Sequence, residues 1–206
     1  MGKILKVTEQ TKNRFLNLYE LDTVKKTGKA GKYFVASRAE KEADLKLVTH
    51  KNKPDGVAMY AVCGDQKDKV LLVRQYRYAI DGFIYEFPAG LVDAGETFRE
   101  AAVREVREET GLTFRPIETD PIYEEPRFMT IGMTDESCAM VYGYADGTMT
   151  QKYLEETEEI EAVLADKGEI RRILKEENVA APCAYQLMHF LADPEPFGFL
   201  TSNKEI

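Results

Sequence analysis

Glutamates in the segment 96–109 are spaced in a way that suits the binding of a divalent cation. Glu105, Glu108 and Glu109 are close in sequence, and Glu105 and Glu109 are four residues apart. In a helix, residues four apart lie one turn from each other on the same face, so both carboxylates can reach one ion. Oxygen-only ligands favour hard cations, so we expect Mg²⁺, with Mn²⁺ as a substitute.

The helix that must carry these glutamates is predicted to span residues 97–110. Thr97 and Glu100 have the Ser/Thr-x-x-Glu spacing of a capping box, and Gly111 suits the residue that ends a helix. At about 100° per residue, Glu109 falls within the buried arc and Glu105 at its edge. An acidic helix is often only a solvated helix, but inward-facing carboxylates repel one another unless a cation lies between them.

Two neighbouring features add to the metal site. Residues 87–90 should form a tight loop after a strand, with backbone carbonyls, that of Ala89 included, available to a cation. Arg104 can pair with a neighbouring glutamate and fix its rotamer, although a solvated helix charge is the simpler interpretation.

These residues resemble the Nudix box, G-x5-E-x7-R-E-U-x-E-E-x-G-U, at every defined position. The resemblance implies a Nudix α/β/α sandwich that hydrolyses a nucleoside diphosphate linked to another group. The matching residues are Gly90, Glu96, Arg104, Glu105, Val106, Glu108, Glu109, Gly111 and Leu112.

The flanks of the box resemble the ADP-ribose pyrophosphatase branch of this family. In the segment 72–77, Arg77 matches an arginine that the branch offers to the substrate phosphates, and Glu86 in 85–90 matches a residue near substrate or metal. The simpler interpretations are a strand-end surface charge for Arg77 and a bulge or turn residue for Glu86.

One downstream segment departs from this branch. Its Ser-Pro-Gly and acidic pair are replaced here by residues 130–136, which keep the spacing of Gly132 and Glu136 but have Ile131 in place of the proline. The resemblance still implies that Gly132 and Glu136 contact substrate, while the choice of substrate within the branch stays open.

The acidic segment 155–160 resembles the loop that supplies a catalytic base in this branch. Glu156 and Glu158 occupy the matching positions, and a solvated acidic turn before a strand is the alternative. We expect Glu156 or Glu158 to accept the proton of the attacking water, and Arg104 and Glu108 to belong to the catalytic group. Neither histidine lies in a motif.

The rest of the chain predicts the mixed α/β architecture that the sandwich requires. We expect an N-terminal β lobe over residues 1–52, for dimerisation and substrate contacts, and a Nudix catalytic domain over 53–206. The predicted strands are 15–21, 33–37, 57–62, 69–75, 137–144 and 160–164, and the further helices are 168–177 and 181–192.

The resemblance implies a Mg²⁺-dependent hydrolase that converts ADP-ribose to AMP and ribose 5-phosphate, with roughly two or three ions held by the three glutamates and Ala89. A hydrolase of another nucleotide sugar, such as GDP-mannose, is the first alternative. A Nudix-fold sensor that binds nucleotides without cleaving them is the second, and the complete set of box glutamates argues against it.

The composition of the chain disfavours several classes of partner and location. The net charge of −8 disfavours nucleic acid, and no apolar run is long enough for a signal peptide or a membrane span. Three scattered cysteines indicate neither a disulfide framework nor a metal site. We expect a cytoplasmic homodimer whose partner is a nucleoside diphosphate substrate.

Overall fold

The computed structural model describes residues 1–154 and 159–201. The chain divides into two compact units, one formed by residues 1–55 with 126–138 and the other by 56–125 with the residues from 139 onward. The segment 126–138 therefore packs with the N-terminal residues, although the sequence analysis groups it with the catalytic domain.

The first unit is built on an antiparallel sheet in the order β1 (Lys3–Glu9), β2 (Asn17–Val24) and β3 (Ala30–Ser37). Alternate residues of β2 point inward, so Tyr19 and Leu21 form a small core with residues of the neighbouring segments. The sequence pattern does not predict β1, because this edge strand buries little of its surface and shows no clear alternation.

Two short helical turns and one short strand complete this unit. The turns η1 (Glu42–Asp44) and α1 (Lys46–Thr49) flank Leu45, which is fully buried in the same core. The strand β9 (Arg127–Phe128) pairs with the first residues of the strand that begins at Ser137.

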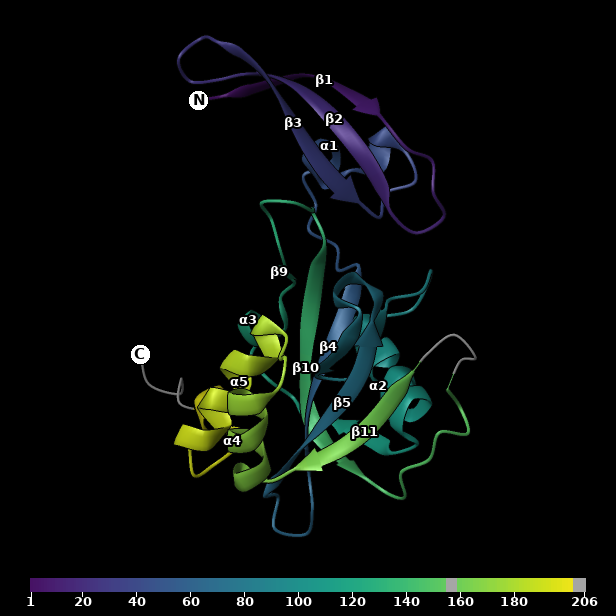
Figure 1. The fold of residues 1–206 in the computed structure, drawn as a ribbon, viewed down its shortest axis with the longest axis vertical. Helices are drawn as coiled ribbons and strands as arrows, with labels where there is room; N and C mark the ends of the chain where they lie inside the picture. Colours follow the sequence, from purple (N-terminus) through teal and green to yellow (C-terminus); the bar gives the residue numbers. More distant parts are fainter. Residues whose placement is uncertain (155–158, 202–206) are drawn as a thin grey trace. The chain divides into compact units, whose positions relative to one another are not determined.

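The second unit is organised around a sheet with the central order β11-β5-β4-β10-β8, in which β6 pairs with β5 and β7 with β4. Figure 1 labels β11, β5, β4 and β10 of this sheet. Its strands are β4 (Gly56–Cys63), β5 (Lys69–Arg77), β6 (Gly82–Glu86), β7 (Ala89–Leu91), β8 (Thr113–Pro116), β10 (Ser137–Asp146) and β11 (Ile160–Ala165).

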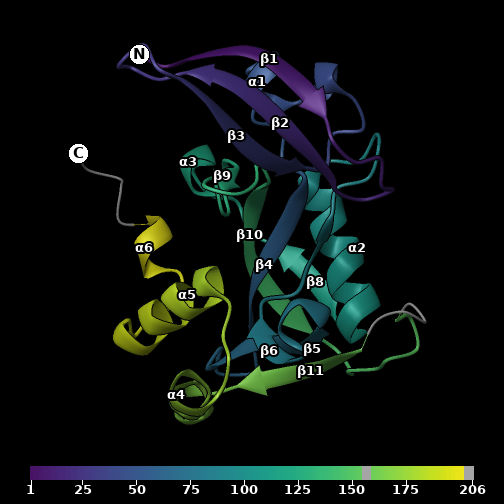
Figure 2. The same ribbon diagram turned by 45° about the horizontal axis from the view of Figure 1, so that its top comes forward.

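Helices cover both faces of this sheet, so the second unit is an α/β/α sandwich. Figure 2 shows α2 on one face and α4 and α5 on the other. The helical segments are η2 (Tyr78–Ile80), α2 (Phe98–Thr110), α3 (Pro121–Glu124), α4 (Lys167–Glu176), α5 (Ala181–Ala192) and α6 (Gly198–Thr201).

The alternation of β4 explains this layering. Val57, Met59 and Ala61 pack in the cluster under α2, whereas Tyr60 and Val62 belong to the cluster under α4 and α5. A strand buried on both faces is apolar along its whole length, as β4 is. Among the residues that the structure describes, no helix is long and apolar enough to cross a membrane.

Candidate active site

Local sequence signals set the start and the end of α2, the helix that carries the glutamates. The Thr97 hydroxyl accepts a hydrogen bond from the Glu100 amide (3.2 Å), and the Glu100 carboxylate accepts one from the Thr97 amide (2.9 Å). Gly111 ends the helix with φ of 76°, where a residue with a side chain would be strained. The predicted capping box and C-terminal glycine are confirmed.

Glu109 is the most deeply buried glutamate of α2, with 3 % of its surface exposed. One of its carboxylate oxygens accepts a hydrogen bond from the backbone amide of Ala89 (3.2 Å). The sequence predicts that Ala89 and Gly90 lie in a loop, but both lie in the short strand β7, which pairs with β4. This pairing fixes the backbone that faces the glutamates.

Glu105 lies against the same strand, directly beside Gly90. A Cβ atom at position 90 would fall 1.9 Å from the Glu105 carboxyl carbon, closer than any real contact. Glycine is therefore required here so that the Glu105 carboxylate can approach the backbone of β7.

Arg104 connects three glutamates through one guanidinium group. It donates two hydrogen bonds to Glu96 (3.0 and 2.9 Å), one to Glu105 (2.7 Å) and one to Glu108 (3.0 Å). A further bond to the Leu91 carbonyl (3.1 Å) ties it to the end of β7. The network holds the Glu105 and Glu108 carboxylates in one orientation.

Glu96 is the member of this network to which the sequence analysis assigned no role. Its two-bond pairing with Arg104 holds the pKa of the Glu96 carboxyl below its ordinary value and raises the pKa of Arg104. Glu96 thus keeps Arg104 in place, and Arg104 in turn positions the glutamates. Both residues are defined positions of the box, and their spacing of eight residues is the sequence signal of this pair.

The donors around β7 have the chemistry that a hard cation requires. Glu105, Glu108 and Glu109 offer carboxylate oxygens, and β7 offers backbone carbonyls, Ala89 among them. Within the described ranges, no three acidic, histidine or cysteine side chains are arranged closely enough to hold a metal ion. The guanidinium of Arg104 bridges Glu105 and Glu108 instead.

Arg77 and Glu86 lie at the ends of two paired strands, β5 and β6. Side chains alternate along a strand, so Arg77 shares a face with Leu71, which packs in the cluster under α2. The Arg77 guanidinium donates two hydrogen bonds to one oxygen of Glu86, at 3.1 Å from Nε and 2.5 Å from Nη2. The structure brings these two predicted substrate residues together as an ion pair.

The remaining predicted site residues do not belong to β5, β6, β7 or α2. Gly132 and Glu136 belong to the segment 126–138 of the first unit, and Arg38 donates a hydrogen bond to Glu136 (2.7 Å). Glu156 and Glu158 fall outside the described residues, so their role stays a prediction.

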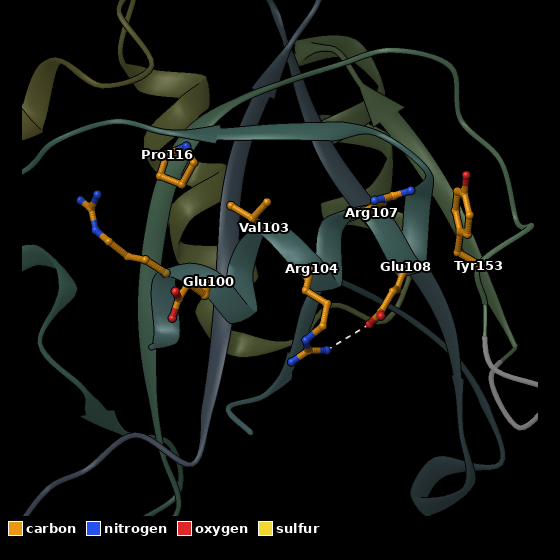
Figure 3. Close-up of a pocket in the computed structure, with 8 residues that line it drawn as sticks. Glu100, Val103, Arg104, Arg107, Glu108, Pro116 and Tyr153 are labelled. Carbon is orange, nitrogen blue, oxygen red and sulfur yellow. Dashed lines mark hydrogen bonds and ion pairs between the residues drawn. The ribbon is translucent and has the colours of Figure 1, made fainter. Parts of the chain in front are cut away.

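A hollow of about 680 Å³ lies on the outer face of α2 (Figure 3). Its walls include Val103 and Pro116, and the Arg107 guanidinium lies 5.0 Å from the centre of the Tyr153 ring. Arg107 also lowers the pKa of the Tyr153 hydroxyl. On a helix, Arg107 and Glu109 are about 200° apart, so the centre of this hollow is not the surface that Glu109 faces.

The NUDIX domain family model matches residues 52–185, about two thirds of the chain. The intact box on α2 agrees with this match, and the chain belongs to the Nudix family.

The chain spans about half the length of the two relatives described here. It is 36 % identical over 120 residues to putative nudix hydrolase 2 of Caenorhabditis elegans, covering 55 % of this chain and 52 % of the relative. It is 31 % identical over 116 residues to an ADP-ribose pyrophosphatase of Bacillus subtilis, covering 56 % and 54 %.

One solved structure, described as an ADP compounds hydrolase, has the same fold. It aligns with a TM-score of 0.65 and 18 % identity over 93 % of this chain and 92 % of its own. At this identity the likeness shows the shared Nudix fold alone.

Proposed function

We propose that this protein is a Mg²⁺-dependent pyrophosphohydrolase that cleaves ADP-ribose to AMP and ribose 5-phosphate. The observation that carries the proposal is the placement of Glu105 and Glu109 against β7, with Arg104 orienting the neighbouring carboxylates. Mutually repelling carboxylates gathered around a backbone that can supply carbonyl oxygens are the arrangement that a hard cation stabilises.

The residues of α2 and β7 would hold the ion. Glu105, Glu108 and Glu109, with the Ala89 carbonyl, would bind Mg²⁺, for which Mn²⁺ is the substitute. The bound cation supplies positive charge, which neutralises the diphosphate and makes water more acidic. This charge also resolves the conflict between an anionic substrate and a chain with a net charge of −8.

The other residues act on the substrate and the water. Arg77 hydrogen-bonds phosphoryl oxygens and is oriented by Glu86, with which it is paired. Glu156, or Glu158 in its place, accepts the proton of the attacking water. Water attacks one phosphorus atom, the bond from that phosphorus to the bridging oxygen breaks, and the two products leave as monophosphates.

The choice of ADP-ribose rests on the flanks of the box. Arg77 and Glu86 match the ADP-ribose pyrophosphatase branch, and the Bacillus subtilis relative carries that name. Gly132 and Glu136 are proposed to contact the substrate, by their positions in the same resemblance. GDP-mannose is the alternative, because Ile131 stands where the branch has proline.

A substrate panel tests the proposal. The protein is incubated with ADP-ribose or GDP-mannose, with Mg²⁺, Mn²⁺ or EDTA, and the nucleoside monophosphate is quantified. We expect AMP release from ADP-ribose that EDTA abolishes. Faster GMP release from GDP-mannose would select the alternative substrate, and tight binding of ADP-ribose without turnover would identify a sensor.

The catalytic base is tested separately. We expect Glu156→Gln to lower kcat by about 100-fold or more, within the range that general-base catalysis contributes. Glu158→Gln should have a smaller effect. A larger loss in the Glu158 variant would transfer the role to Glu158.

We also propose that the protein acts as a cytoplasmic homodimer that pairs through its N-terminal unit. Leu18 and Phe34 lie on paired strands of that unit and are both exposed. The three cysteines are free thiols, in keeping with a reducing compartment. Light scattering should give twice the mass of one chain, and Phe34→Asp should shift it toward the monomer.

A further inference from the structure

Residues 129–136, which we name the substrate loop, form a closed turn. The Thr130 carbonyl accepts hydrogen bonds from the amides of Met133 (2.8 Å) and Thr134 (3.0 Å), and the Met129 amide donates to the Glu136 carbonyl (3.0 Å). Ile131 therefore occupies the second position of a β-turn, the position that proline favours because its ring presets φ.

The N-terminal strand β3 is hydrogen-bonded to this loop through its backbone. The Ala36 amide donates to the Met133 carbonyl (2.9 Å), and the Asp135 amide donates to the Ala36 carbonyl (3.3 Å). These two bonds form a short parallel bridge between Ala36 and Thr134. The loop is thus held by a segment that precedes it by nearly a hundred residues.

Two side chains of the same segment hold the loop where the sequence predicts substrate contacts. The Tyr33 hydroxyl donates a hydrogen bond to the Gly132 carbonyl (2.7 Å). The Arg38 guanidinium donates a hydrogen bond to the Glu136 carboxylate (2.7 Å). The side chains of Arg38 and Glu136 are 34 % and 28 % exposed. All of these residues belong to the first compact unit.

We propose that Tyr33 and Arg38 are positioning residues that fix Gly132 and Glu136 for substrate, in place of the proline that this chain lacks at position 131. The inference rests on the proposed function, in which Gly132 and Glu136 contact the substrate. A turn that lacks proline samples more backbone conformations when it is free, and external hydrogen bonds remove that freedom. The N-terminal unit thereby sets substrate affinity within its own chain.

Substitutions of the two positioning residues test this inference. We expect Arg38→Gln to raise the KM for ADP-ribose roughly tenfold, while kcat changes less than about twofold, because a charge-assisted bond orients Glu136 and does not take part in the chemistry. Tyr33→Phe, which removes one hydroxyl, should raise KM roughly threefold. Arg38→Lys should recover part of the lost affinity, since it keeps the charge.

A matched control lies in the same sheet. Lys32 pairs with Glu20 and Asp22 across β2 and β3, and among the described residues it makes no ion pair with the substrate loop. Lys32→Gln should leave KM unchanged, and thermal unfolding of all variants reports whether the unit is still folded. Calorimetric titration of ADP-ribose in EDTA should give the same order of affinities as the KM values, which separates binding from turnover.

The sharpest test is to install the missing proline. Because Ile131 is at the second position of the turn, Ile131→Pro should restore the KM of Arg38→Gln to within roughly threefold of the unmodified protein. A normal KM for Arg38→Gln alone would overturn the inference, and so would a raised KM that Ile131→Pro does not lower.

Glu136→Gln distinguishes this failure from a failure of the proposed function. If Glu136→Gln raises KM but Arg38→Gln and Tyr33→Phe do not, the positioning role is wrong and the substrate contact stands. If Glu136→Gln changes neither the KM nor the affinity for ADP-ribose measured in EDTA, the proposed substrate contact itself is wrong. We expect the double variant Arg38→Gln/Glu136→Gln to resemble Glu136→Gln alone, because both act through one carboxylate.

Discussion

The carboxylate of Glu105 occupies the space that a side chain at position 90 would need. A Cβ on Gly90 would lie 1.9 Å from the Glu105 carboxyl carbon and 1.9 and 2.4 Å from its two oxygens. Gly90 is held in β7 by its pairing with Val57 of β4, so the backbone cannot withdraw without loss of that pairing. Gly90 and Glu105 are the first and fourth defined positions of the box. Although they are distant in sequence, they depend on each other through this contact.

Gly90→Ala is expected to destabilise the protein and to abolish most activity. The added methyl group must displace the Glu105 carboxylate, which is the end of a flexible side chain, or shift β7. We therefore expect a loss of stability of about 1 kcal/mol, at the low end for overpacking, and a larger loss of activity. Urea unfolding measures the loss of stability, and AMP release measures the loss of turnover.

Two variants control this experiment. Gly82→Ala places a Cβ 3.6 Å from the Ile80 carbonyl, an ordinary contact, and should leave stability nearly unchanged. Gly90→Ala/Glu105→Ala removes the carboxylate from the clash, so it should recover stability but not activity. Equal stability of Gly90→Ala and the unmodified protein would contradict the steric argument.

Glu109→Gln should lower kcat by orders of magnitude while the protein stays folded. The substitution removes a ligand charge but keeps the side-chain volume and an oxygen that can accept the hydrogen bond from the Ala89 amide. Glu124→Gln is the matched control, because Glu124 is also buried but pairs with Arg99. It should reduce thermal stability and leave kcat within about twofold. Retention of most activity by Glu109→Gln would refute the metal site.

Arg104→Lys should weaken Mg²⁺ binding, because lysine cannot contact Glu96, Glu105 and Glu108 together. Residues that orient metal ligands typically contribute 10–100-fold to affinity, so the Mg²⁺ concentration for half-maximal activity should rise by about that factor. Arg172 of α4 also contacts three glutamates, and Arg172→Lys is the control. A similar shift in both variants would show a general effect of arginine loss.

The ion pair between Glu96 and Arg104 should make the stability of the protein depend on pH. Arg104 lowers the pKa of the Glu96 carboxyl below 4.5, so the folded state favours its ionised form. That contribution is fully present above about pH 4.5 and is lost as the pH falls through the lowered value. The difference in Tm between the unmodified protein and Glu96→Gln should therefore be largest near neutral pH and shrink in acid. A difference that does not change with pH would argue against an ionic role.

Local patterns in the sequence were sufficient to predict α2 and its ends. The hydrogen bonds that cap α2 at Thr97 join residues three apart, and Glu105, Glu108 and Glu109 lie within about one turn of one another. Such signals are local, so they can be recognised in the sequence without knowledge of the tertiary structure. The main strands, including β4 and β5, were predicted for the same reason, because their apolar runs are continuous.

Contacts between distant segments could not be read from the pattern. Ala89 and Gly90 looked like a loop, because the three residues of β7 become a strand only through pairing with β4. The pairing of Arg77 with Glu86 depends on the register of β5 and β6, since the two residues are nine apart on different strands.

The sequence by itself determined the Nudix box of this protein, with Glu105, Glu108 and Glu109 on a capped helix and Glu96 just before it. Only the tertiary structure decided how Glu105 meets Gly90, how Glu96 anchors Arg104, and that the substrate loop is held by β3 through contacts such as Arg38 with Glu136, 98 residues apart. The physical reason is that periodicity and capping act over a few residues, whereas steric fit and strand register arise only when distant segments pack together.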